Sequence, residues 1–163
     1  MSNSQALAIL SLAALLGAVG PALAAEEPVK PYVHSNDNAE ARPFAGDHML
    51  KAFHGREGID RVVDGLVDGA VADPRIADIF KGQDLERLRR TLKEQFCYIL
   101  NGGCDYTGRD MKTSHADLGI QQSDFNALVE DLQRSMDHEG VPFRDQNRLL
   151  AKLAPMEHHV VVR

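Results

Sequence analysis

The most informative part of this 163-residue chain reads DYTGRDMKTSHADLGI, from Asp105 to Ile120. Met111, His115 and Leu118 are spaced i, i+4 and i+7, so a short helix here carries an imidazole in the middle of an apolar face. A histidine on such a face is most often a packed residue at the edge of a core. It can also be a ligand, and the surrounding residues bear on which of the two applies.

The segments on either side predict an all-α domain. Apolar residues recur at helical spacing in four of them, over residues 57–72, 85–99, 125–136 and 149–153. Asp84 and Ser123 are suitable N-caps for the second and third of these helices. The segments are separated by residues that end helices, namely Asp73-Pro74, Gly102-Gly103 and Gly140-Val141-Pro142. A short helix after Pro74 is expected to end near Ile79-Phe80, and no segment has a convincing strand pattern.

Residues 1–25 predict a secretory signal peptide. They contain no charged side chain, and an apolar run from Ala6 to Val19 is followed by small residues at Ala22 and Ala24. We therefore expect export to the periplasm, with an uncleaved N-terminal anchor as the alternative. The run is short for a membrane helix, and no later apolar stretch is long enough to cross a bilayer after cleavage.

The remaining chain divides into residues 26–47, rich in polar residues and proline, and a domain over residues 48–163. The composition of 26–47 predicts a flexible linker, with a short helix packed loosely on the domain as the alternative. The formal net charge of −6 does not favour a nucleic-acid partner.

Cys97 and Cys104 are the two cysteines of the chain. In a continuous helix their Cα atoms would be about 10 Å apart, too far for a disulfide. Gly102-Gly103 lies between them and lets the chain turn back, and an exported protein meets an oxidising compartment. We therefore predict a disulfide, with two buried free thiols as the alternative.

Several short motifs, taken in order and with their spacing, resemble group I truncated haemoglobins. The resemblance extends over residues 50–155 and rests on Ala72-Asp-Pro74, Phe80-x-Gly82, Leu85-x-Arg87-Leu88, the double glycine, Tyr106-Thr-Gly108 and the run Met111…His115…Ile120. It implies the fold of that family, which is a two-over-two helical sandwich around haem and is shorter than other globins.

The resemblance also implies haem b as the cofactor. His115 would be the axial ligand of the iron, with its second ring nitrogen held by a backbone carbonyl. Phe80 matches the aromatic residue that wedges the ring, Arg87 and Tyr106 match positions that reach the propionates, and Met111 lies beside them. The alternatives are core packing for Phe80, a solvated helix face for Arg87 and a loop anchor for Tyr106. The chain has no Cys-x-x-Cys-His motif for covalent attachment.

The distal side departs from the family pattern. Val67 stands where many members have tyrosine, and Leu88 and Leu92 stand where polar residues, often glutamine, are common. Such a pocket lacks a hydrogen-bond donor for O₂, although Thr91 and Gln95 are polar and nearby. An internal sixth ligand, Lys93 or His54, is a further possibility.

The resemblance therefore implies a haem protein that binds a diatomic gas, which is O₂, NO or CO. The alternative is a haem redox protein with a redox partner, or an enzyme that detoxifies NO. A haem-free helical interaction domain is the third interpretation, and the presence of both His115 and Phe80 counts against it.

Overall fold

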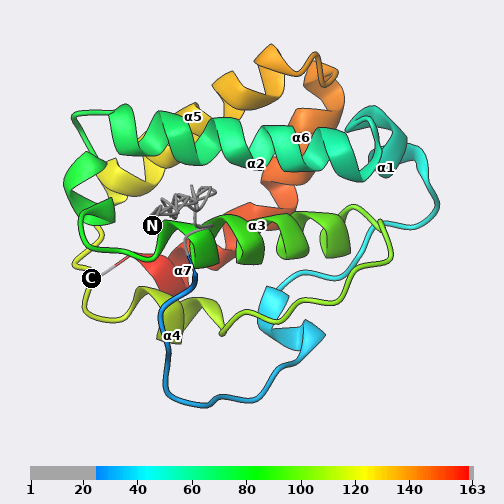
Figure 1. The fold of residues 1–163 in the computed structure, drawn as a ribbon. Coiled ribbons are helices and arrows are strands. Elements are labelled where there is room, and N and C mark those ends of the chain that lie inside the picture. Colours follow the sequence, from blue (N-terminus) through cyan, green and yellow to red (C-terminus); the bar gives the residue numbers. More distant parts are fainter. Residues whose placement is uncertain (1–24, 162–163) are drawn as a thin grey trace, which may run out of the picture.

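The computed structural model describes residues 25–161, and every regular element in that range is a helix (Figure 1). The α-helices are α1 (His48–Ala52), α2 (Gly55–Ala72), α3 (Leu85–Ile99), α4 (Met111–His115), α5 (Gln122–His138), α6 (Phe143–Leu153) and α7 (Glu157–Val160). The 3₁₀ helices are η1 (Asn36–Ala39), η2 (Ala77–Phe80) and η3 (Ala154–Met156). The predicted all-α class is confirmed, whereas the predicted signal peptide, apart from Ala25, lies outside the described residues.

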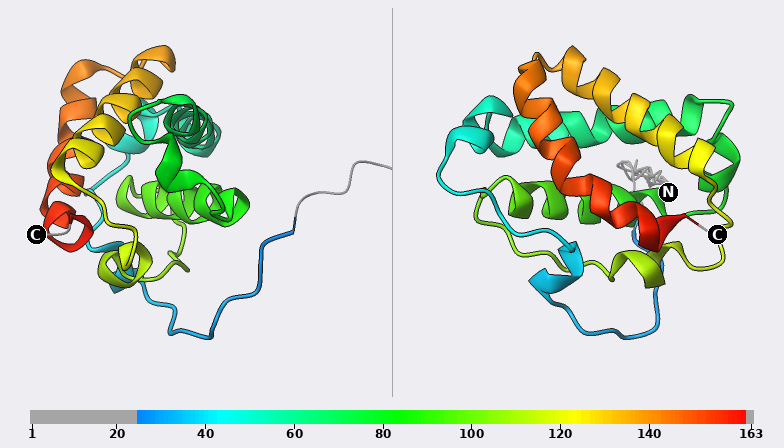
Figure 2. Two further views of the ribbon diagram at one scale, coloured as in Figure 1. Left: turned by 90° about the vertical axis from the view of Figure 1, so that its left-hand side faces the viewer. Right: turned by 180° about the vertical axis from the view of Figure 1, so that it is seen from behind.

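The long helices form two layers (Figures 1 and 2). One layer contains α2 and α3 and the other contains α5 and α6, which gives the expected two-over-two sandwich. The layers approach closely where α2 crosses α5, because Gly65 has no Cβ that would overlap the Ser135 hydroxyl. That hydroxyl donates a 2.7 Å hydrogen bond to the carbonyl oxygen of Val62, which joins the two layers by a polar contact as well.

Apolar side chains on one face of α2 form the centre of the core. Ile59, Val62 and Val63 are 0% exposed, and they pack in one cluster with Phe96 of α3 and Met136 of α5. Complete burial of one such side chain contributes about 1.5–3 kcal/mol. Within residues 25–161, none of the helices combines the length and the apolar character needed to cross a membrane.

Polar side chains determine where two of the long helices begin. Asp84 caps α3 as predicted, because its side chain accepts a 2.9 Å hydrogen bond from the backbone N–H of Arg87. The predicted cap at Ser123 is wrong, since α5 begins at Gln122 and its N-cap is Gln121, two residues before Ser123. The backbone N–H of Gln121 donates to the carboxylate of Asp124 at 2.9 Å, which is the contact that fixes this helix start.

The predicted disulfide between Cys97 and Cys104 is present. Helix α3 ends at Ile99, before the double glycine, and the backbone turns back through Gly103, whose φ of 73° lies in the region that favours glycine. The turn brings the two cysteine Cα atoms to 5.7 Å, a separation that a disulfide spans. Arg56 of α2 holds the same turn, because its Nε donates to a backbone carbonyl there at 2.9 Å.

The segment over residues 26–47 runs along the domain, below α4 and the end of α3 in the view of Figure 1. The structure places η1 within it and buries Ala39 completely, at 0% exposure. Phe44 packs against the core, and its backbone N–H donates to the carbonyl oxygen of Ile99 at 2.8 Å. Part of this segment is therefore a short 3₁₀ helix, and residues on both sides of it pack on the domain.

Candidate functional site

A cavity of about 400 Å³ lies within the domain, and its wall is mostly apolar. A concave apolar site of this size is typical of a bound cofactor or other small molecule. Helices from both layers contribute to the wall, together with η2, α4 and residues near the two ends of the described chain. The structure brings to this wall all eight residues that the resemblance implies, namely Val67, Phe80, Arg87, Leu88, Leu92, Tyr106, Met111 and His115.

The short helix α4 holds His115 at the cavity wall. Asp110 caps this helix, and its side chain accepts a 2.9 Å hydrogen bond from the backbone N–H of Thr113. Glu40 accepts a second, 3.2 Å bond from the backbone N–H of Met111. Two of the N–H groups that a helix leaves free at its start are thereby satisfied, and the negative charge suits the helix dipole.

The imidazole of His115 is fixed by its own helix. Nδ1 lies 2.7 Å from the carbonyl oxygen of Met111, which can only accept a hydrogen bond. Nδ1 therefore carries the proton in the neutral ring, and Nε2 keeps the lone pair that a metal ligand needs.

The helix ends at His115, and Leu118 follows in a turn after Asp117 (φ 67°). The predicted apolar face is thus only partly helical, yet Met111, His115 and Leu118 all line the cavity.

Aliphatic side chains form the wall contributed by α2 and α3, which includes Val67, Leu88 and Leu92. Thr91 and Gln95 also line the cavity, but both use their donors elsewhere. Thr91 Oγ1 donates to a carbonyl oxygen one turn earlier in α3 at 2.9 Å, and Gln95 Nε2 donates to a carbonyl oxygen in η1 at 3.2 Å. This side of the cavity therefore directs no free hydroxyl or amide donor from these residues at a ligand.

The turn before η2 sets the position of Phe80. The carboxylate of Asp73 accepts hydrogen bonds from the backbone N–H of Arg75 at 2.9 Å and from its guanidinium. The side-chain bond from Arg75 holds the pKa of Asp73 below its ordinary value, so the carboxylate stays ionised. Ile76 and Phe80 then pack near Ala70 in a second apolar cluster. Phe80 contributes both to the cavity wall and to core packing.

Tyr106 anchors the loop before α4. Its hydroxyl donates to the carbonyl oxygen of Arg109 at 2.9 Å, and burial raises the pKa of the phenol well above its ordinary value. Gly108 lies directly on the ring, where any Cβ would overlap it. The structure therefore shows the loop-anchor role for Tyr106, on a residue that also lines the cavity.

Arg87 lies at the cavity wall in contact with the N-terminal segment. Its guanidinium bonds the Glu27 carbonyl oxygen, and it lies 3.2 Å from Asp84 Oδ2 and 3.5 Å from Glu26 Oε2. The side chain is 22% exposed, so a freely solvated helix face does not describe it. Three cavity residues of this segment were not predicted, because nothing in its irregular sequence places it at the site: Glu27, Val29 and Tyr32.

The two residues considered as internal sixth ligands do not line the cavity. Lys93 Nζ pairs with the carboxylate of Asp64 at 2.9 Å. His54 Nε2 lies 3.0 Å from the carbonyl oxygen of Glu139, at the junction of α5 and α6. The interpretation of Lys93 or His54 as a ligand is therefore wrong for this arrangement.

The cavity residues suit the haem group that the resemblance implies. The apolar wall would hold the hydrophobic ring system of such a group, and the unprotonated Nε2 of His115 would be the ligand of its iron. The Arg87 guanidinium matches a carboxylate at the edge of the group. Within the described residues 25–161, no three His, Cys, Asp or Glu side chains are grouped so as to hold a metal ion.

The comparisons with known proteins agree on one family. The family described as bacterial-like globin matches residues 49–162. A group 1 truncated hemoglobin of Nostoc sp. is 33% identical over 103 residues, which cover 63% of this chain and 87% of that protein. A group 1 truncated hemoglobin of Chlamydomonas moewusii is 30% identical over 121 residues, covering 73% of this chain and 69% of that protein.

Solved structures show the same fold. The ferric form of truncated hemoglobin from Tetrahymena pyriformis superposes with a TM-score of 0.67 at 19% identity, covering 71% of this chain and 98% of that one. A group II truncated hemoglobin from Bacillus anthracis gives 0.62 at 24% identity, with 70% and 90% coverage. These likenesses concern the arrangement of the helices.

Proposed function

Because this chain belongs to the bacterial-like globin family, we propose that its cavity binds haem b with His115 as the ligand of the iron, and that the protein binds diatomic gases. When bound, the haem iron supplies a coordination position for O₂, NO or CO. The observation that carries the proposal is the orientation of His115, whose Nδ1 is held by the Met111 carbonyl oxygen at 2.7 Å in the wall of an apolar cavity.

The other cavity residues have separate roles in this proposal. Phe80, Leu88 and Leu92 would pack against the bound haem and exclude water from it. Arg87 would donate a charge-assisted hydrogen bond to a propionate. Met111 supplies the carbonyl group that fixes the tautomer of His115.

The aliphatic wall contributed by α2 and α3 favours gases that need no hydrogen bond from the protein. Val67, Leu88 and Leu92 offer no donor, and the donors of Thr91 and Gln95 are engaged within the protein. Retention of O₂ by a strong hydrogen bond is therefore not supported, while NO and CO depend less on such a donor. The same wall disfavours peroxidase chemistry, which uses a polar group for proton transfer.

We also propose that the protein is exported to the periplasm. The apolar N-terminal segment supports this location, as does the Cys97–Cys104 disulfide, since such bonds persist in oxidising compartments. Cell fractionation and mass spectrometry of the N-terminus test it. A chain that retains Met1 in the cytoplasm would contradict it.

Absorption spectra of the haem-loaded protein test the main proposal. We expect a Soret band that shifts when CO is added to the ferrous form, and we expect His115→Ala to abolish or strongly change it. His138→Ala is the matched control, because this exposed histidine does not line the cavity. A wild-type chain that takes up no haem would refute cofactor binding, and an unchanged spectrum in His115→Ala would refute the ligand assignment.

A further inference from the structure

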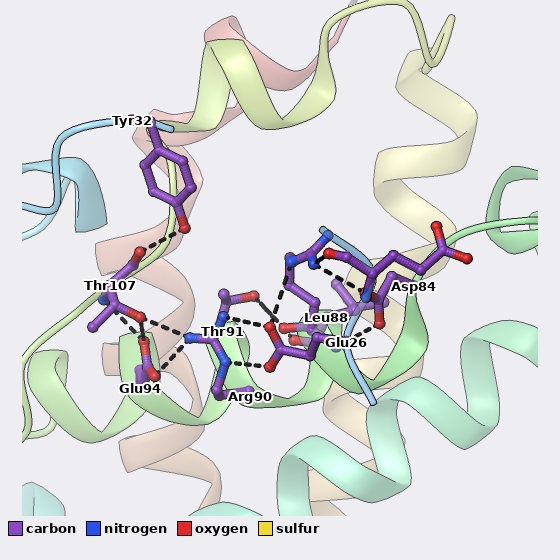
Figure 3. Close-up of polar contacts among 10 residues, drawn as sticks. Glu26, Tyr32, Asp84, Leu88, Arg90, Thr91, Glu94 and Thr107 are labelled. Carbon is purple, nitrogen blue, oxygen red and sulfur yellow. Dashed lines mark hydrogen bonds and ion pairs between the residues drawn. The ribbon is translucent and has the colours of Figure 1, made fainter. Parts of the chain in front are cut away.

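The N-terminal strap, which we define as residues 26–32, forms part of the cavity wall through Glu27, Val29 and Tyr32. Figure 3 shows its first residue beside α3 and its last beside the loop before α4. The strap is therefore fastened near both of its ends to elements that carry cavity residues.

The first fastening of the strap is a cluster of charges on α3. Arg90 bonds both carboxylate oxygens of Glu26, with Nη2 at 3.0 Å from Oε2 and Nε in contact with Oε1. The same carboxylate lies 3.5 Å from Nε of Arg87. The backbone N–H of Glu27 donates to Asp84 at 2.6 Å. The hydrogen bond from Arg90 lowers the pKa of Glu26, which is therefore an anion at neutral pH.

The second fastening is at Tyr32. Its hydroxyl donates to the carbonyl oxygen of Thr107 at 2.8 Å (Figure 3). The guanidinium of Arg109 lies 5.1 Å from the centre of the Tyr32 ring. Between the two fastenings, no hydrogen bond joins residues 28–31 to the remainder of the described chain. Pro28 and Pro31 have no N–H to offer, so the middle of the strap depends on its ends.

Arg87 and Arg90 face different surroundings, although both contact Glu26. Arg87 lines the cavity, whereas Arg90 lies on the side of α3 near the disulfide and is also bonded to Glu94 at 2.8 Å and to Thr107. Arg90 can therefore keep its hold on Glu26 while Arg87 turns to another carboxylate. A haem propionate is such a carboxylate, and a guanidinium binds either one in the same way.

We propose that Glu26 competes with a haem propionate for Arg87, so that the N-terminal strap limits the affinity of the cavity for haem. This inference rests on the proposed function, because it presupposes a haem site next to Arg87. Removal of the Glu26 charge leaves Arg87 with one carboxylate partner among the described residues, Asp84, and should strengthen haem binding. A strap that merely covered the cavity would have the opposite effect, since its loosening would let the haem escape.

The test compares Glu26→Gln with wild type in the full chain, using ferric protoporphyrin IX and its dimethyl ester as separate probes. The ester has no propionate charge and cannot compete for Arg87. Glu86→Gln is the matched control, because Glu86 is exposed in the first turn of α3 and forms no ion pair within residues 25–161. Dissociation constants come from the rates of haem uptake and of haem transfer to a scavenging apoglobin.

We expect Glu26→Gln to bind ferric protoporphyrin IX about three- to tenfold more tightly than wild type. The effect is of this size because Arg87 loses its contact with one carboxylate that is partly exposed. For the dimethyl ester, Glu26→Gln and wild type should agree within about twofold, and Glu86→Gln should match wild type with both probes. Hydrogen exchange gives a second readout, in which haem binding should speed exchange of the Glu27 amide in the wild type.

Several outcomes would overturn the competition. Unchanged or weaker binding of ferric protoporphyrin IX by Glu26→Gln would do so, as would an equal gain with the ester. Slower exchange of the Glu27 amide upon haem binding would also contradict the loss of the Arg87 contacts with the strap. If wild type and both variants bound neither probe, the haem site itself would be refuted, so the two failures are distinguishable.

Discussion

His115 Nδ1 lies 2.7 Å from the carbonyl oxygen of Met111, the residue one helical turn before it. The contact uses a carbonyl group at the start of a five-residue helix, where it is within reach of a side chain at the last helical position. It settles which nitrogen of the ring carries the proton. Both residues line the cavity, so the same short helix supplies the proposed metal ligand and the group that orients it.

The His115→Gly variant should regain haem binding when imidazole is added. Removal of the side chain leaves space at the cavity wall, and free imidazole can enter it as a substitute ligand. Absorption spectra recorded over a series of imidazole concentrations measure the recovery. His138→Gly should bind haem without imidazole, and a His115→Gly variant whose spectrum already equals that of wild type would contradict the assigned ligand.

The Leu88→Gln variant should retain O₂ longer than wild type. An amide donor added to the aliphatic wall can contribute a hydrogen bond of about 1–1.5 kcal/mol, which corresponds to roughly tenfold slower O₂ dissociation. CO dissociation should change less than about threefold, since CO depends less on a donor. Stopped-flow ligand replacement measures both rates. Leu88→Met is the control of similar volume, and equal O₂ rates in the two variants would exclude a role for the added donor.

Asp110→Ala should destabilise the chain at neutral pH by about 1 kcal/mol, because it removes the cap of the helix that carries His115. The backbone bond from Thr113 holds the pKa of Asp110 below its ordinary value of 3.8. A lowered pKa stabilises the folded state above the unfolded value, and this contribution is lost as the pH falls through the folded pKa.

Urea unfolding of wild type, Asp110→Ala and Asp110→Asn at several pH values measures this effect. Asparagine keeps an acceptor for the Thr113 N–H but has no charge to titrate. The advantage of wild type over Asp110→Asn should therefore shrink below about pH 4. If the stability advantage of wild type over Asp110→Asn instead grew as the pH fell, the expected direction of the Asp110 contribution would be contradicted.

Reduction of the Cys97–Cys104 disulfide should lower the free energy of unfolding by about 2 kcal/mol, since the bond closes a short loop in the unfolded chain. Urea unfolding with and without dithiothreitol measures the difference. A Cys97→Ala/Cys104→Ala variant serves as the control, because its stability should not respond to the reductant. Equal stability of reduced and oxidised wild type would contradict a structural role for the bond.

Much of the fold follows from local patterns in the sequence. The apolar spacing in α2, α3, α5 and α6 reflects the single face that each helix buries, and Asp84 caps α3 because a short side chain can reach a free N–H. The prediction of Ser123 as the cap of α5 was wrong because Gln121 and Asp124 together satisfy the free backbone groups at the helix start, so Ser123 is not needed there. Patterns of local spacing therefore identify a helix better than they identify its first residue.

The site was predictable to the extent that it depends on motifs. All eight expected residues line one cavity. The order and spacing of their motifs along the chain predicted this by matching a known family, whereas no single residue could have done so. Glu27, Val29 and Tyr32 were missed because they belong to an irregular segment that reaches the cavity through tertiary contacts alone. The ion pair of Lys93 with Asp64 is equally invisible in the sequence, since the residues lie on different helices.

Glu40 connects three parts of the chain that are far apart in sequence. One carboxylate oxygen accepts the Met111 N–H at 3.2 Å, and the other lies 2.7 Å from Nδ1 of His159 in α7. Glu40 precedes residue 49, where the match to the family begins. A chain trimmed to the matched range would therefore lose an acceptor at the start of α4 and a partner of α7. The range of residues that matches the family is therefore narrower than the part of the chain that packs around His115.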